Sequence, residues 1–206
     1  MFQTRSKWPA LCISLLVFLA EARGQEDCED PGVPPEVVQF NNTLYATCRM
    51  KPSSGLAADL DRLYGHVLFK QEYPDGTLNV HFIIGGFPMG PSNLRAIHVH
   101  QFGDISGGCT STGPHYNPDA VSHPGHPGDF GNFAVKDGKI IEFKEYAKAT
   151  LFGPQSVLGR GVVLHLKADD MGNGGNAESL LNGNAGTRLA CCVIGLSSDA
   201  LWNKCL

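Results

Sequence analysis

The sequence predicts an all-β domain, a sandwich or barrel of roughly eight short strands with two long functional loops. Three features of the composition support this fold class. The 206 residues include 25 glycines and 13 prolines, 42% are hydrophobic and only 17% are charged. Glycine and proline interrupt helices, so this composition excludes a coiled coil and most helical bundles. The hydrophobic content excludes a disordered chain, and no basic excess points to a nucleic-acid partner.

The first 22 residues are predicted to be a secretory signal peptide. Arg5 and Lys7 precede the apolar run 10–20, and residues 20–22 (Ala-Glu-Ala) offer a cleavage site of the small-x-small type. The run is too short for a membrane-spanning helix, which needs about 20 apolar residues. A buried N-terminal helix is the alternative. We therefore expect a secreted protein without a membrane span, whose mature chain carries 14 basic and 19 acidic side chains.

Three regions are expected after the signal peptide. Residues 23–43 are acidic, contain proline and lack periodicity, so we expect a flexible N-terminal arm. Residues 44–196 form the single domain, and residues 197–206 form a short C-terminal tail. The arm ends in Asn41-Asn42-Thr43, a sequon that predicts N-glycosylation of Asn41, unless the sequon is unused.

Hydrophobic alternation predicts the strands of the domain. Apolar and outward-facing residues alternate over 78–84, as in a half-buried strand. We expect a hairpin that joins 66–72 to this strand through a Tyr-Pro-Asp-Gly turn. A second hairpin is expected to join 132–135 to 140–146 through Lys-Asp-Gly-Lys. The other strands are expected at 43–50, 95–102, 161–167 and 188–195.

Two segments, 103–131 and 167–188, are rich in glycine, asparagine, aspartate and proline and show no strand pattern. Loops longer than about 15 residues in a compact domain are usually functional or disordered. The first of these segments contains three of the eight histidines. We therefore interpret it as a functional loop.

Three histidines on predicted strands point to a copper site. The two-residue spacing of His98 and His100 places both imidazoles on one face of a strand, while Ile97 and Val99 take the core face. His165 lies on an apolar strand, where a lone histidine is more often buried and hydrogen-bonded. Together the three supply an all-nitrogen ligand set, which suits copper.

The first long loop points to a zinc site. It offers three imidazoles and a carboxylate, from His115, His123, His126 and Asp129. Four prolines forbid a helix here and stiffen the loop, which can then hold these groups around a tetrahedral ion such as Zn²⁺. The alternative is a polar loop with scattered histidines. No role is assigned to the other two histidines, His66 and His81.

Six cysteines remain after cleavage, and an even number in a secreted chain implies disulfides. Spacing alone does not choose among the possible pairings. Adjacent residues of a strand point to opposite faces, so Cys191 and Cys192 should have different partners. The six are Cys28, Cys48, Cys109, Cys191, Cys192 and Cys205.

These motifs resemble the signatures of the copper/zinc superoxide dismutases. The matching segments occur in the family's order and read AIHVHQFGD at 96–104, TGPHYNP at 112–118, GDFGN at 128–132 and GNAGTRLAC at 183–191. The likeness covers nearly all of residues 45–196. The doubled cysteine and the His-Pro-Gly-His-Pro-Gly run resemble the extracellular branch in particular. The resemblance implies an eight-stranded Greek-key β-barrel, copper and zinc as cofactors, and superoxide as substrate.

The resemblance also implies roles for individual residues. Copper would be bound by His98, His100, His115 and His165, and zinc by His115, His123, His126 and Asp129. His115 would bridge the two ions as an imidazolate and act in catalysis. Asp169 would link a ligand of each metal, and Arg188 would attract the superoxide anion beside copper. The implied disulfides are Cys109–Cys191 and Cys48–Cys192.

The chain departs from the extracellular branch at both ends. Lys204 is the only basic residue of the tail, so we do not expect heparin binding, which needs clustered lysine and arginine. The arm lacks the helical pattern of a tetramerising segment, so we expect a homodimer rather than a tetramer. Within the second long loop, Leu180 and Leu181 stand where the family usually has polar or charged residues, which should weaken electrostatic steering of the substrate. Cys28 and Cys205 either pair with each other or link subunits.

The expected activity is the conversion of superoxide to oxygen and hydrogen peroxide by one-electron cycling of copper. A related copper- and zinc-binding protein without turnover, such as a copper carrier, is the main alternative. A zinc hydrolase would need a general base beside an open zinc position. The predicted zinc site already has four protein ligands, so this third reading ranks last.

Overall fold

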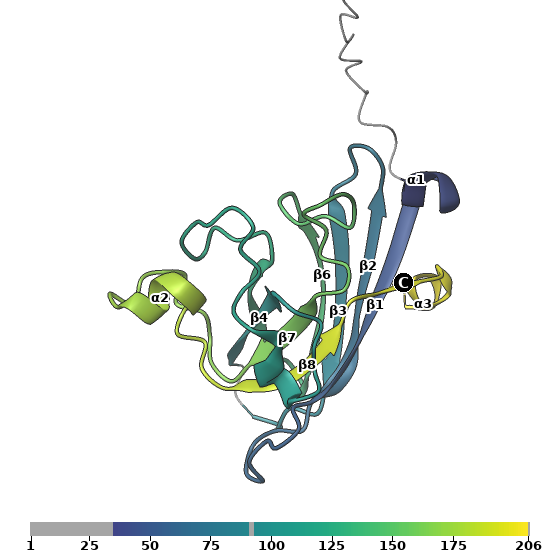
Figure 1. Cartoon of the computed structure of the whole chain (residues 1–206). Coiled ribbons are helices and arrows are strands. Elements are labelled where there is room, and N and C mark those ends of the chain that lie inside the picture. Colours follow the sequence, from purple (N-terminus) through teal and green to yellow (C-terminus); the bar gives the residue numbers. More distant parts are fainter. Residues whose placement is uncertain (1–34, 91–92, 206) are drawn as a thin grey trace, which may run out of the picture. The chain divides into compact units, whose positions relative to one another are not determined.

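The computed structural model describes residues 35–90 and 93–205, where an antiparallel β-barrel is formed (Figure 1). The predicted signal peptide, Cys28 and most of the predicted arm lie outside these ranges. Nine strands follow the order β5-β4-β7-β8-β1-β2-β3-β6, with β9 paired to β1. The strands are β1 (Thr43–Pro52), β2 (Tyr64–Glu72), β3 (Leu78–Gly85), β4 (Leu94–His100), β5 (Asp129–Ala134), β6 (Lys139–Tyr146), β7 (Gly161–His165), β8 (Arg188–Val193) and β9 (Gly195–Ser197).

The predicted fold class is confirmed for the described residues. The alternation expected over 78–84 is present in β3, where buried and half-buried positions follow one another along the whole strand. Ile194 divides the strand expected at 188–195 into β8 and the three-residue β9. Inside the barrel, Phe82 packs against Phe133 with ring centroids 4.4 Å apart. Burial of such side chains contributes about 1.5–3 kcal/mol each, and this core supports the strands that carry the histidines.

One predicted hairpin is confirmed and the other is wrong. Strands β2 and β3 pair across the expected Tyr-Pro-Asp-Gly turn. Strands β5 and β6 form no backbone ladder with each other; only the isolated bridge between Lys136, which follows β5, and Lys139 stands in its place. Each finds a longer ladder elsewhere, β5 on β4 and β6 along all of β3. The Lys-Asp-Gly-Lys turn is present, but it joins the two edge strands of the sheet, β5 and β6, rather than two paired strands.

Two short helices correct the expectations for the ends of the domain. Helix α1 (Pro35–Gln39) lies within the predicted flexible arm, and its Val37 is buried in the core. Helix α3 (Ala200–Lys204) occupies the predicted tail. Its Trp202 is buried and lies 6.3 Å from the rings of both Tyr45 and Phe143. Each helix has five residues, too few to show a hydrophobic period in the sequence.

The two long loops also contain short helices. The 3₁₀ helix η1 (Gly108–Thr112) lies in the first loop and α2 (Ala177–Asn182) in the second. Figure 1 shows α2 and α3 on opposite sides of the barrel. Within the described ranges, none of the helices has the length and apolar character needed to cross a membrane.

Candidate metal centre

Four buried histidines from β4, β7 and the first long loop converge. His98 and His100 come from β4, where a register shift lies between Ile97 and His98, and His165 is the last residue of β7. The first long loop adds His115, which forms a β-bridge with His100. The candidate ligand atoms of these four histidines all lie within 4.8 Å of one another. The structure thus brings together every residue expected to bind copper.

The expected zinc ligands form a second cluster that shares His115. The candidate ligand atoms of His115, His123, His126 and Asp129 also lie within 4.8 Å of one another. The Asp129 carboxylate is central, because one of its oxygens is 3.1 Å from Nδ1 of His115 and the other is 3.0 Å from Nδ1 of both His123 and His126. His115 Nδ1 therefore faces the second cluster, and Nε2 is its remaining nitrogen.

Unpartnered nitrogens show that these clusters suit metal ions. Four buried imidazole nitrogens have no hydrogen bond of good geometry within the described chain: His66 Nδ1, His98 Nδ1, His115 Nε2 and His123 Nδ1, although the last lies 3.0 Å from an oxygen of Asp129. A buried polar atom without a partner costs about 1–3 kcal/mol. Three of the four belong to the predicted ligands, where a bound cation would satisfy them, whereas His66 lies in neither cluster. Imidazoles with one carboxylate are suitable ligands for both zinc and copper, so the residues present fit both ions.

Asp169 joins the two clusters from behind. Its Oδ2 accepts a hydrogen bond from His98 Nε2 at 2.9 Å, and its Oδ1 accepts one from His123 Nε2 at 2.8 Å. Burial would raise the pKa of Asp169, but these hydrogen bonds bring it below its usual range. We call the ring nitrogen that faces away from the metal cluster the outer nitrogen. A carboxylate bound to this nitrogen fixes the ring and its tautomer, so Nδ1 of His98 and of His123 is left for a metal.

Other acceptors on outer nitrogens were not predicted from the sequence. His100 Nδ1 lies 2.8 Å from the carbonyl of Gly113, and His165 Nδ1 lies 3.2 Å from that of Gly186. The side-chain amide of Asn132 anchors the backbone of Asp169: its Oδ1 accepts from the Asp169 N–H at 2.7 Å, and its Nδ2 donates to the Asp169 carbonyl at 2.8 Å. Backbone carbonyls have no sequence signal. Asn132 stands within the GDFGN motif, which could have marked it.

A missing side chain makes room for Asp169. Gly183 has a φ of 65°, in the left-handed region, and a Cβ there would overlap the Asp169 carboxylate and approach His123 Nε2 to 2.7 Å. Glycine therefore meets two requirements at this position, the backbone conformation and the close approach.

The electrostatics favour neutral imidazoles on the copper side. Burial, together with neighbouring histidines, lowers the pKa of His100 and of His165 well below its usual value. Burial is also the main cause that lowers the pKa of His115 to about 4. A neutral imidazole is the form that binds a metal, so these residues need no deprotonation at neutral pH.

His123 differs from the other buried histidines. Burial alone would lower its pKa, but Asp129 and Asp169 raise it to about 9. Burial would likewise raise the pKa of Asp129, yet hydrogen bonds from three histidines hold it far below its usual range. The two carboxylates thus favour positive charge at this point, as a cation site requires.

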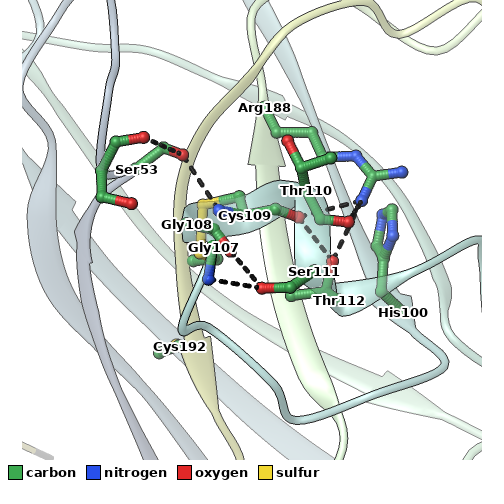
Figure 2. The surroundings of a disulfide bond; sticks show 12 residues. Ser53, His100, Gly107, Gly108, Cys109, Thr110, Ser111, Thr112, Arg188 and Cys192 are labelled. Atoms are coloured by element: carbon green, nitrogen blue, oxygen red, sulfur yellow. Dashed lines mark hydrogen bonds between the residues drawn. A yellow bond between two sulfur atoms is a disulfide. The ribbon is translucent and has the colours of Figure 1, made fainter.

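Arg188 is held beside the copper cluster by the turn at Cys109. Its Nη1 donates to the Cys109 carbonyl at 2.9 Å and to Thr112 Oγ1 at 3.1 Å. Figure 2 shows the guanidinium next to His100, with its other terminal nitrogen directed away from the turn. Burial lowers the pKa of Arg188. A cavity of about 1100 Å³ opens here and is lined by Arg188, His100, His115 and His165.

Both disulfides implied by the resemblance are present, Cys48–Cys192 and Cys109–Cys191. The prediction that Cys191 and Cys192 have different partners is confirmed. Cys192 joins the main hydrophobic core, whereas Cys191 and Cys109 form a separate buried cluster. Cys205 forms no disulfide with the described cysteines.

Comparison with known proteins agrees with this geometry. A family model for copper/zinc superoxide dismutase (SODC) matches residues 63–194. The chain is 54% identical over 165 residues to the extracellular superoxide dismutase (Cu-Zn) of Homo sapiens, which covers 80% of this chain and 69% of that protein. For the Oryctolagus cuniculus protein of the same name, identity is 56% over 163 residues, or 78% of this chain and 66% of that protein.

A more distant relative is the superoxide dismutase (Cu-Zn) of Talaromyces marneffei, 44% identical over 141 residues, or 65% of this chain and 90% of that protein. The chain thus spans about two thirds of the length of the two extracellular relatives and covers most of the fungal protein. The family match includes β2 through β8, and with them every residue of the two histidine clusters. The chain belongs to the copper/zinc superoxide dismutase family.

Proposed function

We propose that this protein converts superoxide to oxygen and hydrogen peroxide, with copper and zinc bound at the two histidine clusters. Copper would be held by His98, His100, His115 and His165, and zinc by His115, His123, His126 and Asp129. The observation that carries this proposal is the sharing of His115, whose Nε2 has no hydrogen-bond partner among the described residues, between two buried ligand sets. Two superoxide anions and two protons give one molecule of each product.

The bound ions supply complementary chemistry, because copper accepts and returns one electron while zinc does not change its oxidation state. With Nδ1 of His115 facing Asp129 and the zinc ligands, Nε2 is the nitrogen that would hold a proton on the copper side once Nδ1 is bound to metal instead of hydrogen. Arg188 can bind the anion through Nη2 and Nε, because its hydrogen bonds to the described residues use Nη1. Asp169 and the carbonyls of Gly113 and Gly186 keep the imidazoles oriented.

Local charge supports attraction of the substrate anion to a net-negative protein. Arg160, Lys167 and Arg188 line the cavity, and Glu178 is the one carboxylate among its described lining residues. A concave site with an excess of positive charge focuses the field toward its base. The most deeply buried residues of its lining include His100, His115 and His165.

The protein is secreted. Its relatives of 54% and 56% identity are named extracellular, and its two disulfides are typical of an oxidising compartment. We further propose cleavage after Ala22 and glycosylation of Asn41, which is exposed between α1 and β1. We also propose that the protein is a homodimer. We propose that it has no heparin affinity, since Lys204 is the only basic residue in the predicted tail.

Metal analysis combined with superoxide consumption tests the proposed activity. The purified protein should contain copper and zinc and should accelerate the loss of superoxide. Replacement of a predicted copper ligand, His165→Ala, should remove copper and activity, whereas the matched variant His81→Ala should keep both. Bound copper without faster loss of superoxide would favour the copper-carrier alternative, and absence of copper would contradict both readings.

A further inference from the structure

One wall of the active-site cavity is apolar and contributes little to the folded core. Leu180, Leu181 and Val121 line the cavity, with 50%, 60% and 43% of their surface exposed. Ser179 is the only residue of α2 that is buried, so the two leucines are not needed to attach this helix to the barrel. Clustered exposed hydrophobic side chains mark binding sites more often than isolated ones do.

The leucines are presented on a fixed helix. The Asn176 side chain accepts a hydrogen bond from the Ser179 backbone N–H at 2.9 Å, and Ser179 Oγ donates to Asp170 at 2.7 Å. The carbonyl of Leu180 itself accepts from the His123 N–H at 3.0 Å. The apolar wall is therefore tied to the second histidine cluster, and its leucines keep a defined position beside the cavity.

Basic side chains elsewhere in the same lining, three against the single carboxylate of Glu178, define the charge of the ligand. Arg188 lines the cavity, and its second terminal guanidinium nitrogen is directed away from the Cys109 turn (Figure 2). Lys167 and Arg160 add positive charge to the same cavity. Its volume of about 1100 Å³ is far more than a two-atom anion fills, and it lies at the upper end of the range for organic ligands.

We propose that this cavity binds an amphipathic organic monoanion, a carboxylate with a hydrocarbon body. The carboxylate would pair with Arg188, because a guanidinium matches a carboxylate in shape and charge. The hydrocarbon would cover Leu180, Leu181 and Val121 and remove them from water. Bound in this way, the carboxylate lies across the approach to His100 and excludes superoxide. The competition with superoxide rests on the proposed function, whereas the binding itself does not.

Calorimetry with three probes tests the two halves of this site separately. Acetate carries the charge alone, octanamide the hydrocarbon alone, and octanoate carries both. Each buried methylene strengthens binding about fourfold, so a few that cover the leucines should make octanoate bind at least about tenfold more tightly than acetate. Octanoate should also bind more tightly than octanamide. The titrations use the metal-loaded mature protein and, in parallel, the metal-free protein.

Matched variants locate the site. The double variant Leu180→Gln/Leu181→Gln keeps side-chain length and helix propensity; it should lose the octanoate preference about tenfold and leave acetate binding unchanged. Arg188→Gln should weaken both carboxylates. The control is Leu196→Gln, which replaces an equally exposed leucine of β9 that does not line the cavity. Octanoate should also inhibit superoxide consumption competitively, and less so in the double variant.

Several results would overturn the inference. It is wrong if octanoate binds no more tightly than acetate, if the double variant keeps the preference, or if Leu196→Gln loses it equally. A protein that binds octanoate as described but does not consume superoxide would contradict the proposed function and leave this inference standing. A protein that consumes superoxide but shows no octanoate preference would contradict this inference and leave the proposed function standing.

Discussion

At the scale of single residues, the outer nitrogen of each histidine determines what its inner nitrogen can do. His98 and His123 donate to the same carboxylate, and His100 and His165 lie against backbone carbonyls. Each ring is thereby oriented before any ion binds. Ordered ligands lose less conformational entropy on binding, so these acceptors contribute to metal affinity although they do not touch the metal.

Asp169→Asn should weaken binding of both metals. An amide has one acceptor oxygen, so its NH₂ group would face the N–H of either His98 or His123 and that histidine would lose its anchor. Loss of such a partner typically costs about 10–100-fold in metal affinity. Competition against a chelator measures the change. Asp170→Asn is the control, because that carboxylate accepts from Ser179 and contacts no histidine ligand; equal affinity in wild type and Asp169→Asn would contradict the assigned role.

At the scale of elements, features set by local sequence pattern could be predicted from the sequence, whereas long-range strand pairing could not. The alternation in β3 and the spacing of His98 and His100 are local, and the sequence was sufficient to predict both. The pairing of β5 with β4 is not local, and the correct turn at 136–139 suggested the wrong partner strand. The carbonyls that orient His100 and His165 come from distant loops, so no local signal marks them. The five-residue helices α1 and α3 are too short to leave a period.

The two disulfides should have different consequences when removed. Each closes a long loop, with sequence separations of 144 and 82 residues. Either double alanine variant should therefore lose roughly 2–5 kcal/mol of unfolding free energy. Cys48–Cys192 lies in the main core, so its removal should preserve activity per bound copper. Removal of Cys109–Cys191 should also lower activity, because the Cys109 carbonyl holds Arg188.

Chemical denaturation and turnover per copper distinguish these outcomes. The Cys48→Ala/Cys192→Ala variant is the matched control for Cys109→Ala/Cys191→Ala, since each removes one bond and two sulfur atoms. Equal losses of activity per copper in the two variants would show that the Cys109 turn does not position Arg188.

Tyr146 should make the barrel sensitive to alkali. Its hydroxyl donates to the Phe130 carbonyl at 3.2 Å, and the two rings lie 4.3 Å apart. Burial, with Glu142 nearby, raises the pKa of Tyr146 above its usual value. Above about pH 10 the unfolded chain loses this proton while the folded chain keeps it, so stability falls as pH rises. Urea titrations at pH 8 and pH 10.5 measure the effect: Tyr146→Phe should lose less unfolding free energy over this interval than wild type. The control is Tyr64→Phe, which changes an exposed tyrosine. If the pH dependence of Tyr146→Phe equals that of wild type, Tyr146 does not have this role.

At the scale of the whole molecule, global and local charge oppose each other. The mature chain expected after cleavage has 14 basic and 19 acidic side chains, which repel an anion at long range. The cavity has three basic side chains and one carboxylate among its described lining residues. Screening by salt acts on both effects, so the sign of the salt dependence shows which of them controls the encounter with superoxide.

We expect local attraction to control that encounter, so superoxide consumption should slow as ionic strength rises, whereas control by net charge would make it faster. Arg188→Ala should reduce the rate about tenfold or more and flatten this dependence while copper is retained. Arg188→Lys should keep the salt dependence, because it keeps the charge, but should be slower, because it loses part of the anchoring at Cys109 and Thr112. The control is Lys70→Gln, which removes the same charge from a lysine of β2 that pairs with Glu72 outside the cavity. If Lys70→Gln flattened the dependence as much as Arg188→Ala, net charge rather than the cavity would direct the substrate.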